Sequence, residues 1–166
     1  MNLIEIAKSI NWQDPSKFKV MILPTGSDSS NLINITPEIL TASINNIRLA
    51  DINTAPIEEW IGEEWRFATG RLENYQVEIT MKDFDNFKLY RMWANAKQKF
   101  VRAYPDDQKF DIKIQTASDY QITDYKDMVT FKDCMLITVN SPTLDNSANA
   151  SVAEFSIVAK SSYVDI

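Results

Sequence analysis

The stretch WRFATGRLENYQVEITMKDFDNFKLYRMW, residues 65–93, decides the fold class of this chain. Over residues 75–81 apolar and polar side chains alternate, which is the two-residue period of a strand with one apolar and one wet face. Trp65 and Phe67 begin the same alternation, and a glycine-containing turn is expected at 69–71. The stretch therefore predicts two paired strands in one sheet.

The same stretch continues into an expected helix over residues 84–100. Asp83 is a predicted N-cap, and Asp85 falls in the first turn, where the helix dipole favours a negative charge. Lys97 and Lys99 fall in the last turn, where the dipole favours positive charge. Large apolar residues recur every three or four positions, so this helix is expected to cover the sheet.

The predicted core consists of apolar residues that share one face of these strands or one stripe of the helix. They are Trp65, Phe67, Tyr75, Val77, Ile79, Phe84, Phe87 and Trp93.

Before this stretch, the pattern predicts a helix over residues 1–15, a strand over 17–23 and a strand over 39–49. Residues 50–60 are expected to form an irregular connection, because they are polar and contain Pro56.

After the helix, strands are expected at 109–116, 128–139 and 152–163. These strands and the two helices give a mainly β (α+β) fold, a small antiparallel β-sandwich or half-barrel with a flanking helix. We expect one domain over residues 1–166, with the β core in 17–166.

Composition limits the class of protein. Of the 166 residues, 45% are apolar, which is typical of a globular chain, and no run is long enough to span a bilayer. We therefore expect a soluble protein without membrane insertion. Cys134, the single cysteine, lies in an apolar run and is expected to be a buried hydrophobe rather than a reactive thiol.

The chain contains no histidine, which removes the commonest general base and transition-metal ligand. Acidic pairs such as Glu63-Glu64 could suggest a carboxylate hydrolase, but neighbouring residues of a strand point to opposite faces. Three glycines give no phosphate-binding loop, and no metal-ligand spacing is present. We expect no enzyme, no catalytic residue, no metal and no cofactor.

The run from 65 to 96, in which a strand, a glycine turn, a strand and a helix with Trp93 follow one another, resembles the central segment of contractile bacteriophage tail tube proteins. Residues 129–164, VTFKDCMLITVNSPTLDNSANASVAEFSIVAKSSYV, resemble the closing hairpin of that family, with a proline-containing turn and a polar loop. The likeness covers most of the chain after Lys17.

This resemblance implies a structural subunit that forms hexameric rings, whose inner wall is a continuous barrel. The rings would stack helically into a hollow tube inside a contractile sheath and conduct DNA into a host cell. Implied partners are further copies of the chain, the sheath protein, and the baseplate and tail terminator proteins. The implied location is the virion, after assembly in the cytoplasm of the host bacterium.

The net charge of the chain is consistent with a channel that conducts DNA. The 23 acidic and 17 basic residues give a net charge of −6, and an acidic wall repels DNA, whereas a basic wall would bind phosphates at every ring. DNA would then pass without specific binding.

Two sets of residues are assigned as hypotheses. The predicted lumen wall is the polar face of the two strands: Glu64, Arg66, Gln76, Glu78 and Thr80. The alternative is that these residues lie on an ordinary solvent-exposed face, because one face of an antiparallel sheet is commonly exposed to solvent. The predicted ring-stacking segment holds Asp51, Ile57, Glu58, Glu59, Trp60 and Ile61. Its Trp60 is either folded under its own domain or available to a partner.

Three other functions remain open. The same architecture serves as the tube protein of type VI secretion systems or phage-like particles, or as a baseplate protein that initiates the tube. A carbohydrate-binding β-sandwich is suggested by four Trp and six Tyr. A hydrolase that uses only carboxylates is the least favoured.

Overall fold

The computed structural model describes residues 17–27, 29, 36–49, 54–61, 64–72, 75–102, 104–117, 125–144 and 152–166. Within 54–61 and 64–72 it describes the backbone, and side chains only for Glu58 and Trp60. The helix expected over 1–15 lies outside the described residues.

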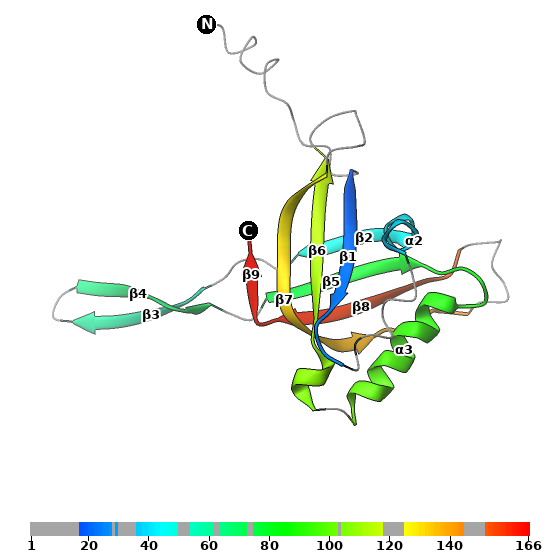
Figure 1. Cartoon of the computed structure of the whole chain (residues 1–166). Helices are drawn as coiled ribbons and strands as arrows, with labels where there is room; N and C mark the ends of the chain where they lie inside the picture. The colour runs from blue at the N-terminus through cyan, green and yellow to red at the C-terminus, as the bar shows by residue number, and fades with distance from the viewer. Residues whose placement is uncertain are drawn as a thin grey trace, which may run out of the picture.

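The elements follow the order β1 (Phe18–Pro24), α2 (Pro37–Ser43), β2 (Ile44–Leu49), β3 (Thr54–Ile61), β4 (Glu64–Leu72), β5 (Tyr75–Lys82), α3 (Lys88–Phe100), η2 (Pro105–Gln108), β6 (Phe110–Ala117), β7 (Tyr125–Val139), β8 (Glu154–Ser161) and β9 (Tyr163–Asp165). Figure 1 shows a bent sheet with α3 against it and the β3–β4 hairpin projecting from it.

The main sheet is antiparallel and has seven strands in the order β1-β6-β7-β8-β5-β2, with β9 paired to β7. It does not close, since β1 and β2 are its two edges. The prediction of a mainly β half-barrel with a flanking helix is therefore confirmed. The strands expected at 109–116, 128–139 and 152–163 are present as β6, β7, and β8 with β9.

Strand β7 connects the two halves of this sheet. Its first part pairs with β6 and β9, and its last part, Met135–Val139, pairs with β8. The register shifts beside Asp133, whose φ of 51° is left-handed, as is typical of a bulge that bends a strand. The bend allows one long strand to contribute to two differently oriented halves.

Polar contacts hold this bend. Asp111, a buried residue of β6, accepts a hydrogen bond from the backbone N–H of Asp133 at 3.0 Å and another from Lys132 Nζ at 2.9 Å. The hydrogen bond with Asp111 raises the pKa of Lys132 above its ordinary value of 10.5. Ser161 Oγ lies 2.7 Å from the carbonyl oxygen of Lys132 and donates toward it, tying the end of β8 to the same point. A buried carboxylate therefore has partners on both of its oxygens, as burial requires.

The core lies between the bent sheet and α3. Trp93 of α3 is fully buried and its ring packs 6.2 Å from that of Phe110, between centroids. Tyr90 makes an edge-to-face contact with Phe155 at 5.9 Å. Apolar burial of this kind stabilises the fold by roughly 25 cal/mol per Å² removed from water.

The predicted strand at 39–49 is wrong over its first half, because residues 37–43 form α2. Thr36 caps this helix by accepting a hydrogen bond from the N–H of Ile39, Pro37 stands at its first position, and Glu38 lies in its first turn. These are the usual signals of a helix start, and they override the apolar residues that suggested a strand.

The predicted pairing of the two strands in 65–81 is also wrong. Strand β4 continues through the expected turn at 69–71 and pairs with β3, which occupies the supposedly irregular connection 50–60. Strand β5 instead pairs with β2 and β8. The segment around Gly70 is therefore part of a strand, and the last pair of the β3–β4 ladder is Ile61 with Glu64.

The expected helix at 84–100 begins later, at Lys88. Asp85, Asn86 and Phe87 have φ of 46°, 59° and 60°, and such left-handed residues cannot begin an α-helix. Asp83 nevertheless caps α3 across this turn, because its carboxylate accepts hydrogen bonds from the N–H groups of Leu89 and Tyr90, both at 3.0 Å. The side chain of Asp83 thus caps the helix, although the N-cap residue is Phe87 and the predicted first turn is wrong.

Candidate assembly surfaces

The polar face of β5 carries three of the five residues predicted to line a lumen. Gln76 is exposed, and Glu78 and Thr80 are half-buried. Between them Val77 and Ile79 point into the core, with 1% and 2% of their surfaces exposed. The alternation along β5 therefore separates one apolar and one polar face.

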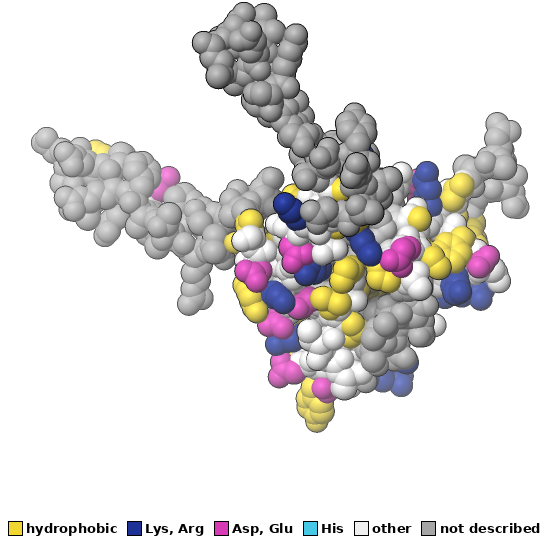
Figure 2. Space-filling view, turned by 45° about the horizontal axis from the view of Figure 1, so that its top comes forward, with side chains coloured by type: hydrophobic (Ala, Val, Ile, Leu, Met, Phe, Trp, Pro, Cys, Tyr) yellow, Lys and Arg dark blue, Asp and Glu magenta, His cyan; other side chains and the backbone are white. Residues whose placement is uncertain are grey.

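This polar face has mixed charge and is not acidic. Arg48 of β2 lies opposite Glu78, and on the other side Lys160 of β8 lies opposite Gln76. Lys82 lies opposite Glu154 at the far end. Three cations and two carboxylates thus share the described part of this face, so it carries charges of both signs. Figure 2 shows a similar interspersion of basic and acidic side chains on the face it presents.

Glu64 and Arg66, the other two predicted lumen residues, belong to β4 and so to a different sheet from β5. Their side chains lie outside the described residues, as do those of the predicted core residues Trp65 and Phe67. The structure therefore does not join the five residues on one continuous sheet.

The remaining predicted core residues lie in the main body. Trp93 is fully buried, while Tyr75 and Phe84 are partly buried and pack against the core. Phe87 is partly buried and stands at the N-cap position of α3.

The predicted ring-stacking residues from Ile57 to Ile61 lie in β3. Glu58 is exposed, and Trp60 has 55% of its surface exposed. Asp51 lies outside the described residues, and the side chains of Ile57, Glu59 and Ile61 are not described. The hairpin pairs β3 with β4 and with no other strand of the described chain. An isolated two-stranded hairpin is marginally stable in water, so contact with a partner would stabilise this one.

Both edges of the main sheet are candidates for contact with another chain, and sequence reasoning did not identify them. Helix α2 partly covers the β1 edge, where Thr41 Oγ1 accepts a hydrogen bond from the N–H of Val20 at 3.0 Å. Lys19 of the same strand forms an ion pair of 3.1 Å with Glu38 of α2. Strand β2 pairs only with β5 among the described strands, which leaves its other side for pairing.

The described part of the chain contains no group of three or more His, Cys, Asp or Glu residues that could hold a metal. Cys134 is buried, as expected, and its burial raises the pKa of the thiol to about 12. Within the same described residues, every helix is too short or too polar to cross a membrane.

Solved structures provide the comparison. A chain of the PVC extracellular contractile injection system, from its sheath–tube complex in the extended state, superposes with a TM-score of 0.69 and 17% identity, over 99% of this chain and 97% of that one. A chain from the tube-terminating cap of the anti-feeding prophage superposes with a TM-score of 0.65 and 20% identity, over 99% of this chain and 97% of that one. A chain from the PVC sheath/tube terminator superposes with a TM-score of 0.63 and 18% identity, over 92% of this chain and 94% of that one. No model of a known protein family and no curated protein matches the sequence.

The fold is thus one found in the tube, cap and terminator assemblies of contractile injection systems, over nearly the whole length of each chain. The fold expected from the resemblance to contractile tail tube proteins is confirmed.

Proposed function

We propose that this chain is a structural subunit of the tail tube of a contractile injection system, and not an enzyme. Copies of it associate into hexameric rings, and the rings stack into a hollow tube inside a contractile sheath. The observation that carries the proposal is the near full-length superposition on a chain of a sheath–tube complex.

The architecture supports self-association independently. An open sheet leaves unpaired backbone groups along an edge, and closure into a ring of copies is one way to pair them. The projecting β3–β4 hairpin supplies a second surface that differs from the edge. Contacts between unlike surfaces close into rings or extend into helical filaments, and a tube needs both.

The partners follow from the same role. In the particle, this subunit would contact the sheath protein along its length and the baseplate and tail terminator proteins at its ends, after assembly in the cytoplasm of the host bacterium. The particle is a phage tail or a related phage-like injection machine. A tube cap or a baseplate tube-initiator is the second candidate, because the anti-feeding prophage cap and its baseplate also contain chains of this fold.

The polar face around Gln76, Glu78 and Thr80 is our candidate for the lumen wall. Interspersed charges of both signs present no continuous basic track, so DNA would pass without the counterion release that drives tight binding. Glu64 and Arg66 are assigned to the same bore as part of this proposal.

Negative-stain microscopy of the purified chain tests the assembly. Long tubes with a central channel support the tube subunit, and single capped rings support the cap or initiator. The matched variant replaces residues 54–72 with a short Gly/Ser linker, which removes the hairpin and leaves the main sheet. This variant should keep its thermal transition and lose the tubes; a wild-type chain that stays monomeric at high concentration contradicts the proposal.

Retention of DNA by assembled tubes tests the lumen assignment. Glu78→Lys should leave tubes intact and make them hold short DNA at low salt, with binding that weakens as salt rises. Lys126→Glu, on an exposed position of β7, is the control that should not change retention. Equal retention by the wild type and Glu78→Lys would place Glu78 away from the bore.

A further inference from the structure

The exposed side of α3 is a basic stripe. It consists of residues that recur every three or four positions and are all exposed: Lys88, Arg91, Asn95, Gln98, Lys99 and Arg102. The sequence from Lys88 to Tyr104 contains no Asp or Glu. In a chain with a net charge of −6, this concentration of positive charge is a distinct surface.

The four cations of the stripe form no ion pair with another described residue. The ion pairs formed by the described residues involve Lys19, Lys109, Lys113 and Lys132, and none involves a cation of the stripe. Lys97, on a more buried side of the helix, differs, because its Nζ donates to the carbonyl oxygen of Leu136 at 2.7 Å. The stripe therefore remains available to an acidic partner.

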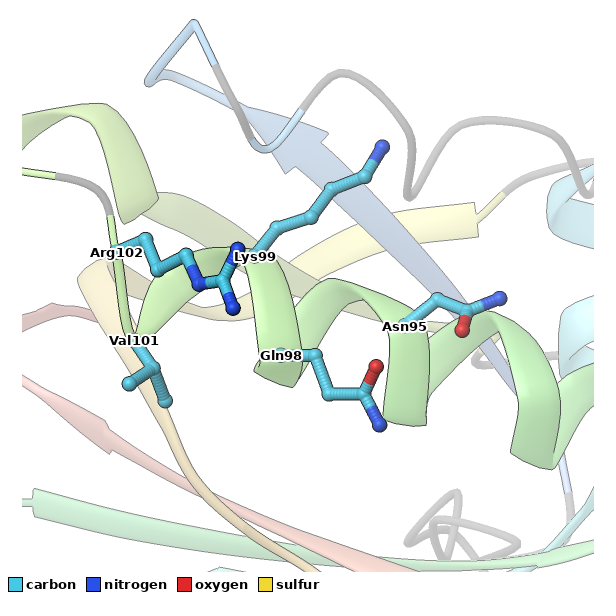
Figure 3. A pocket seen from close by; sticks show the side chains of 5 residues that line it. All are labelled: Asn95, Gln98, Lys99, Val101 and Arg102. Atoms are coloured by element: carbon cyan, nitrogen blue, oxygen red, sulfur yellow. The ribbon is translucent and has the colours of Figure 1, made fainter.

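A hollow and two apolar side chains lie at the C-terminal end of the stripe. The hollow has a volume of about 540 Å³, and its described lining is Asn95, Gln98, Lys99, Val101 and Arg102 (Figure 3). Val101 is 76% exposed, and Tyr104 is 81% exposed just beyond it. A partner that fits this end needs acidic groups together with a large apolar side chain, since aromatic anchors beside charged residues dominate many interfaces.

The tip of the β3–β4 hairpin has that composition. Residues 58–65 read EEWIGEEW, with four carboxylates and no base. Glu58 is exposed, and Trp60 is 55% exposed. Charge and apolar character therefore match the basic stripe and its apolar end.

The two surfaces lie on different sides of one chain. Figure 1 shows the hairpin projecting to one side of the sheet and α3 lying on another. A contact between them joins one copy to the next and cannot close on itself, which is the kind of contact that propagates an assembly.

We propose that the basic stripe of α3 receives the acidic tip of the β3–β4 hairpin of a second copy of this chain. The proposal rests on the proposed tube function and names the surface that the hairpin contacts. Trp60 packs near Val101 and Tyr104, and the carboxylates of the tip lie along the cations of the stripe.

A charge-swap experiment tests this pairing. The stripe variant carries Arg91→Glu, Lys99→Glu and Arg102→Glu, and the tip variant carries Glu58→Lys, Glu59→Lys and Glu64→Lys. Each variant alone places like charges together, and the concentration needed for tube formation should rise by about tenfold or more. An equal mixture of the two variants restores two complementary contacts, and tubes should return.

Single changes provide the control. Arg102→Glu should weaken assembly, whereas Lys126→Glu, which changes the charge equally on an exposed position of β7, should not. Circular dichroism and thermal unfolding of each variant should match the wild type, as expected for changes at exposed side chains such as Glu58, Arg91 and Arg102.

The possible outcomes separate the two proposals. Normal tubes from the stripe variant, or a mixture that fails to assemble, overturn the pairing while the tube function stands. Normal tubes that lose only their binding to a sheath protein also overturn it, because the stripe would then serve that partner. A wild-type chain that forms no rings or tubes removes the proposed function itself.

Discussion

Oδ1 of Asp111 accepts a hydrogen bond at 3.0 Å from the backbone N–H of Asp133, the residue at which β7 turns from one half of the sheet to the other. The carboxylate is buried, and its Oδ2 pairs with Lys132. A side chain of β6 thereby fixes the bend on which the half-barrel depends, and with it the relative placement of the two sheet edges proposed for assembly.

Asp111→Ala should lower the free energy of unfolding by about 2 kcal/mol, because the partly buried N–H of Asp133 loses its acceptor and Lys132 loses its partner. Asp111→Asn keeps one oxygen as acceptor and should cost less. Urea unfolding followed by fluorescence measures both. Equal stability of Asp111→Ala and the wild type would show that the bend does not depend on this carboxylate.

Asp83→Ala should cost about 2 kcal/mol, at the upper end for a helix cap, because the carboxylate accepts from three N–H groups, those of Phe84, Leu89 and Tyr90. The loss should appear in urea unfolding, with faster hydrogen exchange at the first turn of α3. Asp106→Ala is the control, since that carboxylate is exposed on η2 and, among the described residues, forms an ion pair with Lys109 alone. A similar small cost for both variants would contradict the capping role.

These contacts show where sequence reasoning succeeds. The two-residue period of 75–81 correctly separates the buried and polar faces of β5 because it depends only on the strand itself. The capping role of Asp83 is also local in sequence, although its reach to Tyr90 depends on the left-handed turn of Asp85, Asn86 and Phe87, for which no periodic pattern exists.

Strand pairing is harder to predict because partners lie far apart along the chain. Strand β5 pairs with β8, and no local feature of 75–82 indicates that partner. The nearby Gly70 suggested a turn, and the resulting false hairpin joined Glu64 to Glu78 on one face. The expectation of a purely acidic face around Glu78 followed from that pairing, whereas the neighbours of Glu78 in the sheet include Arg48. The start of α2, in contrast, could have been recognised from Thr36, Pro37 and Glu38.

The Cys134 thiol should not react with a water-soluble disulfide reagent at pH 8 in the folded protein. Its burial and its pKa of about 12 keep the thiolate population small and inaccessible. One equivalent should react after unfolding in denaturant. Rapid reaction without denaturant would show that the junction between β7 and β8 opens readily.

Stability should decline in acid as the carboxylate of Asp127 is protonated. Hydrogen bonds from Lys113, and then from Gln115, lower the pKa of Asp127 below its ordinary value of 3.8. A lowered pKa adds stability above 3.8, and this contribution is lost as the pH falls through the value of the folded state.

Asp127→Asn should therefore be slightly less stable than the wild type at pH 7, and the difference should disappear near pH 2, as urea midpoints at both values would show. The effect is small because the pair is exposed. A constant difference at all pH values would mean that charge is not its cause.

The most direct test of the account is a helical cryo-EM reconstruction of the assembled wild-type chain. We predict rings of identical copies stacked around an open bore, with Gln76, Glu78 and Thr80 of β5 facing that bore. A chain that remains single, or rings in which this face of β5 turns away from the bore, would contradict the central claim.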